Sequence, residues 1–191
     1  MEEKLKQISD RNTNCIKVVL YGPESTGKTS LAKALADYYE TTYVEEFSRY
    51  YAELKSKQNL PLTKDDVLPI AIGQIQKENE QLKSANKLLI CDTDLLETQV
   101  YSEFYYNGFC PEIVKKKALE NTYDLYFLTY IDIAWEADGI RDKPNNRLQM
   151  YKRFEQILKR SKKPFITVKG SFEERLNTCK RYIDELLKKA Y

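Results

Sequence analysis

The stretch Val18-Val19-Leu20-Tyr21-Gly22-Pro23-Glu24-Ser25-Thr26-Gly27-Lys28-Thr29-Ser30 decides the fold of this chain. Apolar residues come first, followed by a loop between two glycines and then a run with helical spacing of apolar residues. This order predicts a buried strand, a tight loop and a helix. Residues 22–29, which we call the phosphate loop, match the pattern G-x-x-x-x-G-K-[ST] in full. The stretch therefore predicts a nucleoside triphosphate site.

Each residue type in the phosphate loop has a physical reason. Gly22 and Gly27 let the backbone curl tightly, so that amide N–H groups face phosphate oxygens. Lys28 can reach the β- and γ-phosphates, and the Thr29 hydroxyl can bind Mg²⁺. The positive end of the helix that begins there also favours a polyanion. The residues expected to bind ATP are Gly22, Glu24, Ser25, Thr26, Gly27, Lys28, Thr29 and Ser30.

The composition predicts a single α/β domain over residues 15–191, preceded by a polar N-terminal tail over residues 1–14 that forms either a short helix or a frayed end. The net charge of +2 gives no argument for nucleic acid, and no apolar run suggests membrane insertion or a signal peptide. Four scattered cysteines without a C-x-x-C pair favour a reducing cytoplasm over a zinc site. The sequence does not exclude a homo-oligomer.

The chain contains no histidine, so any general base must be another residue type. This excludes histidine-dependent nucleotidyl transfer and makes carboxylates the leading candidates for a base.

Strand and helix patterns alternate along the whole chain. After the first strand, we expect strands near residues 42–44, 88–91, 123–131 and 164–168, and a last helix from Ser171 with Phe172 facing the core. Such alternation predicts three α/β/α layers around a mainly parallel five-stranded sheet.

Ligands of an open parallel sheet bind beyond the carboxyl ends of its strands. Carboxylates follow three strands there: Glu45 and Glu46, then Asp92 and Asp94, then Asp132. Asp92 ends an apolar strand and is expected to bind Mg²⁺ together with Thr29. Asp94 has two interpretations, as a substrate ligand or as the cap of the next helix.

Glu46 is a candidate base for a substrate hydroxyl, and Asp92 is the other. Arg49 shares a helical face with Glu46, so the two could orient a ribose; a solvated ion pair is the alternative. Tyr50 is a further candidate pocket residue.

Residues 132–154 differ from their surroundings and predict a lid over the triphosphate. Arg141 and Arg147 could neutralise the transferred phosphoryl group, whereas the alternative is a basic surface loop. Trp135 could stack on a base or simply pack. Asp138 lies in the same segment.

Several segments together resemble the ribosylnicotinamide kinase domain of bacterial NadR-type proteins. They are the phosphate loop, Tyr43-Val-Glu-Glu-Phe-Ser-Arg-Tyr50, Ala71-Ile-Gly-Gln74, Cys91-Asp-Thr-Asp94 and Ile131-Asp-Ile-Ala-Trp-Glu-Ala-Asp138-Gly-Ile-Arg141. The resemblance covers residues 15 to 185. A proline that the family carries in its Pro-Glu-Tyr-Ala-Arg pattern is Glu45 here, while Glu46 and Arg49 remain.

The resemblance implies a P-loop NTPase fold of the nucleoside and nucleotide kinase type, and transfer of the γ-phosphate of ATP to the 5′-hydroxyl of nicotinamide riboside. Glu46, Arg49, Asp92 and Asp94 would line the riboside site, and residues 135–147 would include the lid. Another nucleoside or a vitamin alcohol such as thiamine is an alternative acceptor. A nucleotide-binding switch is the alternative from a different class.

Overall fold

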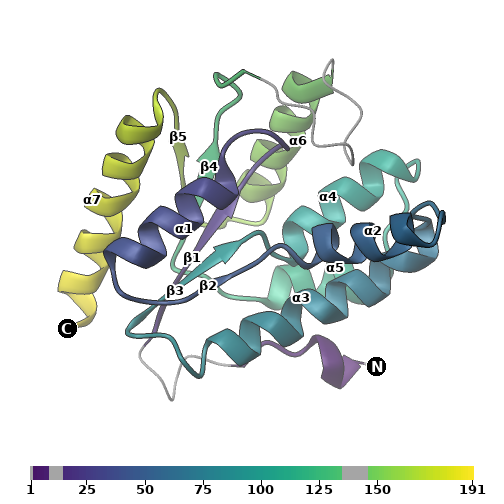
Figure 1. The fold of residues 1–191 in the computed structure, drawn as a ribbon, viewed down its shortest axis with the longest axis horizontal. Coiled ribbons are helices and arrows are strands. Elements are labelled where there is room, and N and C mark those ends of the chain that lie inside the picture. Colours follow the sequence, from purple (N-terminus) through teal and green to yellow (C-terminus); the bar gives the residue numbers. More distant parts are fainter. Residues whose placement is uncertain (1, 9–14, 135–145) are drawn as a thin grey trace.

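A five-stranded parallel sheet forms the centre of the molecule (Figure 1). The computed structural model describes residues 2–8, 15–134 and 146–191. The strand order is β2-β3-β1-β4-β5, and each neighbouring pair runs parallel. The strands are β1 (Ile16–Tyr21), β2 (Tyr43–Val44), β3 (Leu88–Asp92), β4 (Leu125–Thr129) and β5 (Phe165–Val168). The predicted three-layer α/β architecture is thereby confirmed.

Strand β1 lies in the middle of the sheet, and all six of its residues are buried. Successive side chains of a strand point to opposite faces. Val19 and Tyr21 therefore join one apolar core, and Ile16, Val18 and Leu20 join the other. Such a strand must be apolar on both faces, which explains the continuous hydrophobic run before Gly22.

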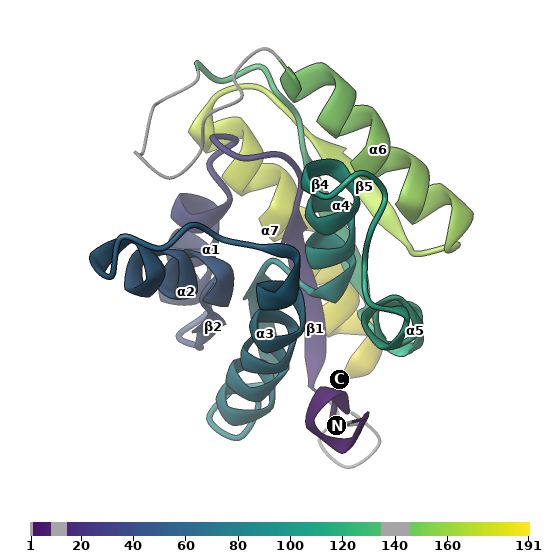
Figure 2. The same cartoon turned by 90° about the vertical axis from the view of Figure 1, so that its right-hand side faces the viewer.

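Helices cover both faces of the sheet (Figure 2). One face carries α1 (Lys28–Tyr38) and α7 (Phe172–Ala190). The other carries α3 (Val67–Gln81), α4 (Leu95–Tyr105), α5 (Glu112–Glu120) and α6 (Arg147–Arg160). Helix α2 (Phe47–Lys57) packs against α3, which begins just after a short 3₁₀ turn, η3 (Lys64–Asp66). No helix in the part of the chain that the structure describes has the length and apolarity needed to cross a membrane.

Of the two forms predicted for the N-terminal segment, residues 2–8 contain the short helix, and they pack onto the domain. A 3₁₀ turn, η1 (Glu2–Leu5), places Leu5 at 0% exposure in the same core as α3 and α5. Gln7 donates to Glu78 Oε1 at 2.6 Å, and its side-chain oxygen accepts from the Thr122 amide at 2.8 Å. The polar composition concealed this docking, since a single apolar residue carries it.

Two other expectations are corrected by the helices. The sequence predicts that residues 147–154 belong to the lid, but they form the first turns of α6, which buries Met150, Tyr151 and Phe154. The sequence also predicts Phe172 in the core, but it is 46% exposed at the start of α7. The last helix does begin after Ser171 as predicted, with Ser171 and Glu174 forming a capping box.

We expect Leu5→Ala to lower the free energy of unfolding by about 2–5 kcal/mol, because it removes a fully buried side chain and leaves a cavity. Ile8→Ala is the matched control, since Ile8 is 41% exposed and should cost less than about 1 kcal/mol. Urea denaturation measures both. Equal, small effects would contradict the docking of residues 2–8.

Candidate active site

The phosphate loop joins the end of β1 to the start of α1 with the geometry that nucleotide binding requires. Gly22 and Gly27 have backbone φ values of 140° and 80°, a region that residues other than glycine rarely adopt. A Cβ atom on Gly22 would lie 2.6 Å from Thr129 Oγ1 on β4. Helix α1 begins at Lys28, so its N-terminal amide groups face the loop.

Lys28 and Thr29 connect the loop to its surroundings. The Lys28 ammonium donates to the carbonyl oxygens of Gly22 at 2.6 Å and Pro23 at 3.0 Å. The Thr29 hydroxyl donates to Asp92 Oδ2 at 2.5 Å, because β3 pairs with β1 and ends beside α1.

The pair of Thr29 and Asp92 fits a magnesium site that the nucleotide completes. Within residues 2–8, 15–134 and 146–191, no group of three histidine, cysteine or acidic side chains could hold a metal ion. Mg²⁺ typically uses only one or two protein oxygens and takes the others from phosphates and water. The donor set therefore suits Mg²⁺ bound with ATP.

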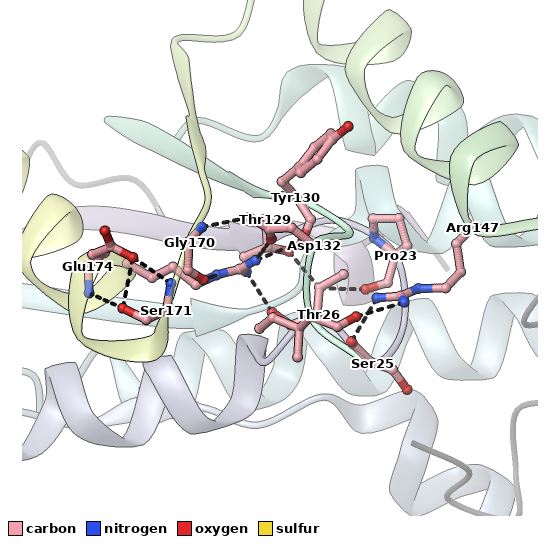
Figure 3. A network of polar contacts seen from close by, with 12 residues as sticks. Pro23, Ser25, Thr26, Thr129, Tyr130, Asp132, Arg147, Gly170, Ser171 and Glu174 are labelled. Atoms are coloured by element: carbon pink, nitrogen blue, oxygen red, sulfur yellow. Dashed lines mark hydrogen bonds and ion pairs between the residues drawn. The ribbon is translucent and has the colours of Figure 1, made fainter. Parts of the chain in front are cut away.

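Arg175 holds the outer side of the phosphate loop, although no motif in the sequence singles it out. This guanidinium is 0% exposed and donates to the carbonyl oxygens of Thr26, Tyr130 and Gly170, at 3.0, 3.0 and 2.9 Å. It also pairs with Asp132, which accepts from the Gly170 amide at 2.6 Å. Figure 3 shows this network linking the loop to the ends of β4 and β5. Asp132 thus belongs to a structural ion pair.

Arg147 is the second arginine on the loop, and its guanidinium donates to Ser25 O at 3.0 Å and Ile133 O at 2.9 Å (Figure 3). Its position at the first turn of α6 places it beside the phosphate loop, from a helix rather than from the predicted lid loop, and its role toward the phosphoryl group stays a prediction. The other three residues predicted for this region, Trp135, Asp138 and Arg141, lie outside the described residues.

A cavity of about 530 Å³ adjoins the phosphate loop on the side of α2, α3 and α4. The residues that line it are Glu24, Glu46, Ser48, Arg49, Ala52, Ser56, Leu60, Pro61, Leu62, Thr63, Val67, Ile70, Gln74, Thr93, Glu97, Thr98, Tyr101, Ser102, Tyr105 and Tyr106. Three acidic side chains, Glu24, Glu46 and Glu97, are among the lining residues, and the rest of the wall combines tyrosines and aliphatic residues with Arg49, Gln74 and several serines and threonines. A cavity of this size and composition suits a small polar molecule with a flat ring.

Glu46 and Arg49 both line this cavity, as the sequence predicted. Glu46 Oε1 accepts from the Ser48 hydroxyl at 2.6 Å, and Glu46 Oε2 lies 4.0 Å from Arg49 Nε. Tyr50 does not line the cavity; it is 51% exposed and its ring packs near Phe47. Its helical neighbours take the inward positions, so we leave Tyr50 out of the site.

Asp94 adopts the capping interpretation. Its Oδ1 accepts from the Glu97 amide at 3.0 Å at the start of α4, and its Oδ2 accepts from the Tyr126 hydroxyl at 2.8 Å. Burial raises the pKa of this carboxyl to about 6. Because Asp94 is fully buried and does not line the cavity, we also leave it out of the acceptor site.

Glu97 is a residue of the site that the sequence reasoning missed. It lies on α4, is 2% exposed, and places Oε1 3.2 Å from the Lys28 ammonium. Removal from water raises the pKa of this carboxyl to about 8, although Lys28 favours its ionised form. The sequence feature that could have identified Glu97 is its position three residues after Asp94, in the first turn of the helix that follows β3.

The sequence matches the family model described as AAA domain (AAA_28) over residues 17–175, which is most of the chain. The matched range includes the phosphate loop, the cavity and Arg175. The chain belongs to the AAA domain family.

This AAA domain also resembles curated bacterial proteins in sequence. It is 29% identical over 174 residues to the trifunctional NAD biosynthesis/regulator protein NadR of Salmonella typhimurium, and 28% identical to that of Escherichia coli. Each match covers 89% of this chain but only 42% of the relative, so the chain spans less than half of their length.

Solved structures share the fold of this AAA domain. A NadR protein in complex with NR aligns with a TM-score of 0.71 and 22% identity, over 85% of this chain and 48% of that one. A NadR protein in complex with NAD and AMP-PNP gives 0.74 and 20%, over 93% and 51%. Deoxyadenosine kinase from M. mycoides with bound dATP gives 0.58 and 16%, over 88% and 99%. The chain thus shares its fold with these proteins.

We expect Arg175→Met to lower the free energy of unfolding by about 3–5 kcal/mol, because it leaves the carbonyl groups of Thr26, Tyr130 and Gly170 without their donor and removes the partner of Asp132. Arg181→Met on the same helix should cost less than about 1 kcal/mol, since Arg181 is exposed and its guanidinium lies over the Tyr182 ring. Thermal and urea denaturation compare the two variants. A small effect at Arg175 would show that the loop does not depend on it.

Proposed function

We propose that this protein is an ATP-dependent kinase that phosphorylates the 5′-hydroxyl of nicotinamide riboside. The observation that carries the proposal is the cavity next to the phosphate loop, because a kinase needs an acceptor site there and a nucleotide switch does not. The kinship with NadR proteins, and a NadR structure solved with NR, supports nicotinamide riboside as the acceptor.

The residues of the site would have separate roles in phosphoryl transfer. Lys28 and the amide groups of the phosphate loop would bind the triphosphate, and Thr29 and Asp92 would hold Mg²⁺. Mg²⁺, when bound, neutralises charge on the phosphates. Arg147 adds positive charge beside the loop, and the predicted lid residues Trp135, Asp138 and Arg141 would complete that side.

Glu46 is the proposed general base, since Glu46 lines the cavity, whereas Asp92 does not and is assigned to Mg²⁺ with Thr29. Its carboxylate would accept the proton of the 5′-hydroxyl as that oxygen bonds to the γ-phosphorus. The bond between the γ-phosphorus and the bridging oxygen of ADP breaks in the same transfer. Arg49, 4.0 Å from Glu46, would orient the ribose.

We also keep a cytoplasmic location as a proposal, supported by the scattered cysteines. Small-molecule substrates are the proposed partners, without nucleic acid.

The first experiment measures ADP formation from Mg-ATP with nicotinamide riboside, common nucleosides or thiamine as acceptor. We expect saturable stimulation by nicotinamide riboside and a product one phosphate heavier by mass spectrometry. Stimulation by another alcohol would correct the acceptor. Slow hydrolysis unaffected by every alcohol would support the nucleotide switch instead.

We expect Glu46→Gln to lower kcat by about 10²–10⁴-fold with a much smaller change in the KM for ATP, because it removes a proton acceptor without reducing the size of the side chain. Glu53→Gln, an identical change at an exposed position of α2, is the matched control and should retain wild-type kcat. Equal rates for the wild type and Glu46→Gln would exclude Glu46 as the base.

A further inference from the structure

Glu97 lies between the nucleotide loop and the acceptor cavity and contacts both. Its Oε1 lies 3.2 Å from Lys28 Nζ, and its Oε2 accepts from the Gly22 amide at 3.4 Å. The same side chain lines the cavity. The carboxyl is almost fully buried, so its partners must come from the protein or from a ligand.

Binding of a triphosphate would change the partner of this carboxyl. The Lys28 ammonium is shared between Glu97 and two loop carbonyl groups in this structure. The phosphate-loop lysine binds the β- and γ-phosphates when nucleotide is present. Glu97 would then lie near a polyanion, and its ion pair with Lys28 would be weakened. A buried carboxylate that loses its counter-charge is strongly destabilised.

Other charges around Glu97 do not compensate for that loss. Glu46, Asp92 and Asp94 all act to raise the pKa of Glu97, and Lys28 is the cation that opposes them. The Gly22 amide that donates to Oε2 is a neutral partner at 3.4 Å, so a stronger partner would come from a ligand in the acceptor cavity that Glu97 lines. Nicotinamide riboside would bring both ribose hydroxyl donors and a positively charged ring into that cavity.

We propose that Glu97 couples the two substrate sites, holding Lys28 before nucleotide binds and interacting with the acceptor once the triphosphate has taken Lys28. Nucleotide and acceptor therefore bind synergistically, each increasing the affinity for the other by the same factor. This inference rests on the proposed function, because it takes the cavity as the acceptor site. Glu97 acts as a positioning residue, whereas Glu46 is the proposed base.

Calorimetric titration of the full chain tests the coupling. The affinity for nicotinamide riboside is measured with and without Mg-AMP-PNP, at about pH 9, where most of the Glu97 carboxyl is ionised. We expect Mg-AMP-PNP to tighten binding about tenfold in the wild type, and less than about threefold in Glu97→Gln. Glu97→Ala is measured in parallel in case the amide variant folds poorly, and circular dichroism checks both.

Glu103→Gln is the matched control, because it is the same change on the same helix at a residue that does not line the cavity. It should retain the wild-type factor. A wild type without synergy, or a Glu97→Gln variant that keeps the full factor, would overturn the coupling.

A second measurement separates this inference from the proposed function. If nicotinamide riboside binds neither the free protein nor the nucleotide complex, the proposed acceptor is wrong. The affinity for Mg-AMP-PNP alone then tests whether Glu97 competes with the nucleotide for Lys28. We expect Glu97→Gln to bind Mg-AMP-PNP at least about threefold more tightly than the wild type, because Lys28 is no longer held and a like charge is removed. An unchanged nucleotide affinity in that case would overturn the inference.

Discussion

The functional architecture depends on how the backbone of the phosphate loop is held. The amide groups of the loop must be available to phosphate. The hydrogen bonds that fix its backbone therefore have to be accepted by its carbonyl oxygens, and neighbouring strands support it. Arg175 bonds to Thr26 O and Arg147 bonds to Ser25 O, while Lys28 takes the carbonyl groups of Gly22 and Pro23. Five donors in a rigid planar arrangement make arginine suited to this task. The loop is therefore shaped by cations before any nucleotide arrives.

The carboxyl end of the sheet concentrates buried charge. Asp92, Asp94 and Glu97 follow one another from the end of β3 into α4, and all three are nearly inaccessible to water. Burial of charge is costly unless partners compensate it. Asp92 accepts from Thr29, Asp94 from Tyr126 and from the start of α4, and Glu97 pairs with Lys28. Burial raises the pKa of Glu97 to about 8 and that of Asp94 to about 6, and strongly shifted pKa values are common at functional sites.

Helix α4 relates the two ligand sites to each other. Its first turn places Glu97 against the phosphate loop, and its later turns contribute Tyr101 and Tyr105 to the cavity wall. The helix packs against α3, α5 and α6, so its position is fixed by the apolar core. The opposite face of the sheet, with α1 and α7, supplies the phosphate loop's helix and the arginine that holds it. Both layers must therefore be assembled before the site exists.

The sequence by itself determined the sheet, the phosphate loop and the candidates Glu46, Arg49 and Asp92. These features rest on local patterns: apolar runs of strand length, glycines at fixed spacing, and carboxylates at strand ends. Only the tertiary structure decided the roles of Glu97 and Arg175, and removed Tyr50 and Asp94 from the acceptor site. The sequence assigns no role to Arg175 and predicts Phe172 in the core, yet Arg175 is buried and Phe172 is 46% exposed. The physical reason is that a side chain's role depends on which distant backbone groups and charges surround it, and helical spacing alone does not contain that information.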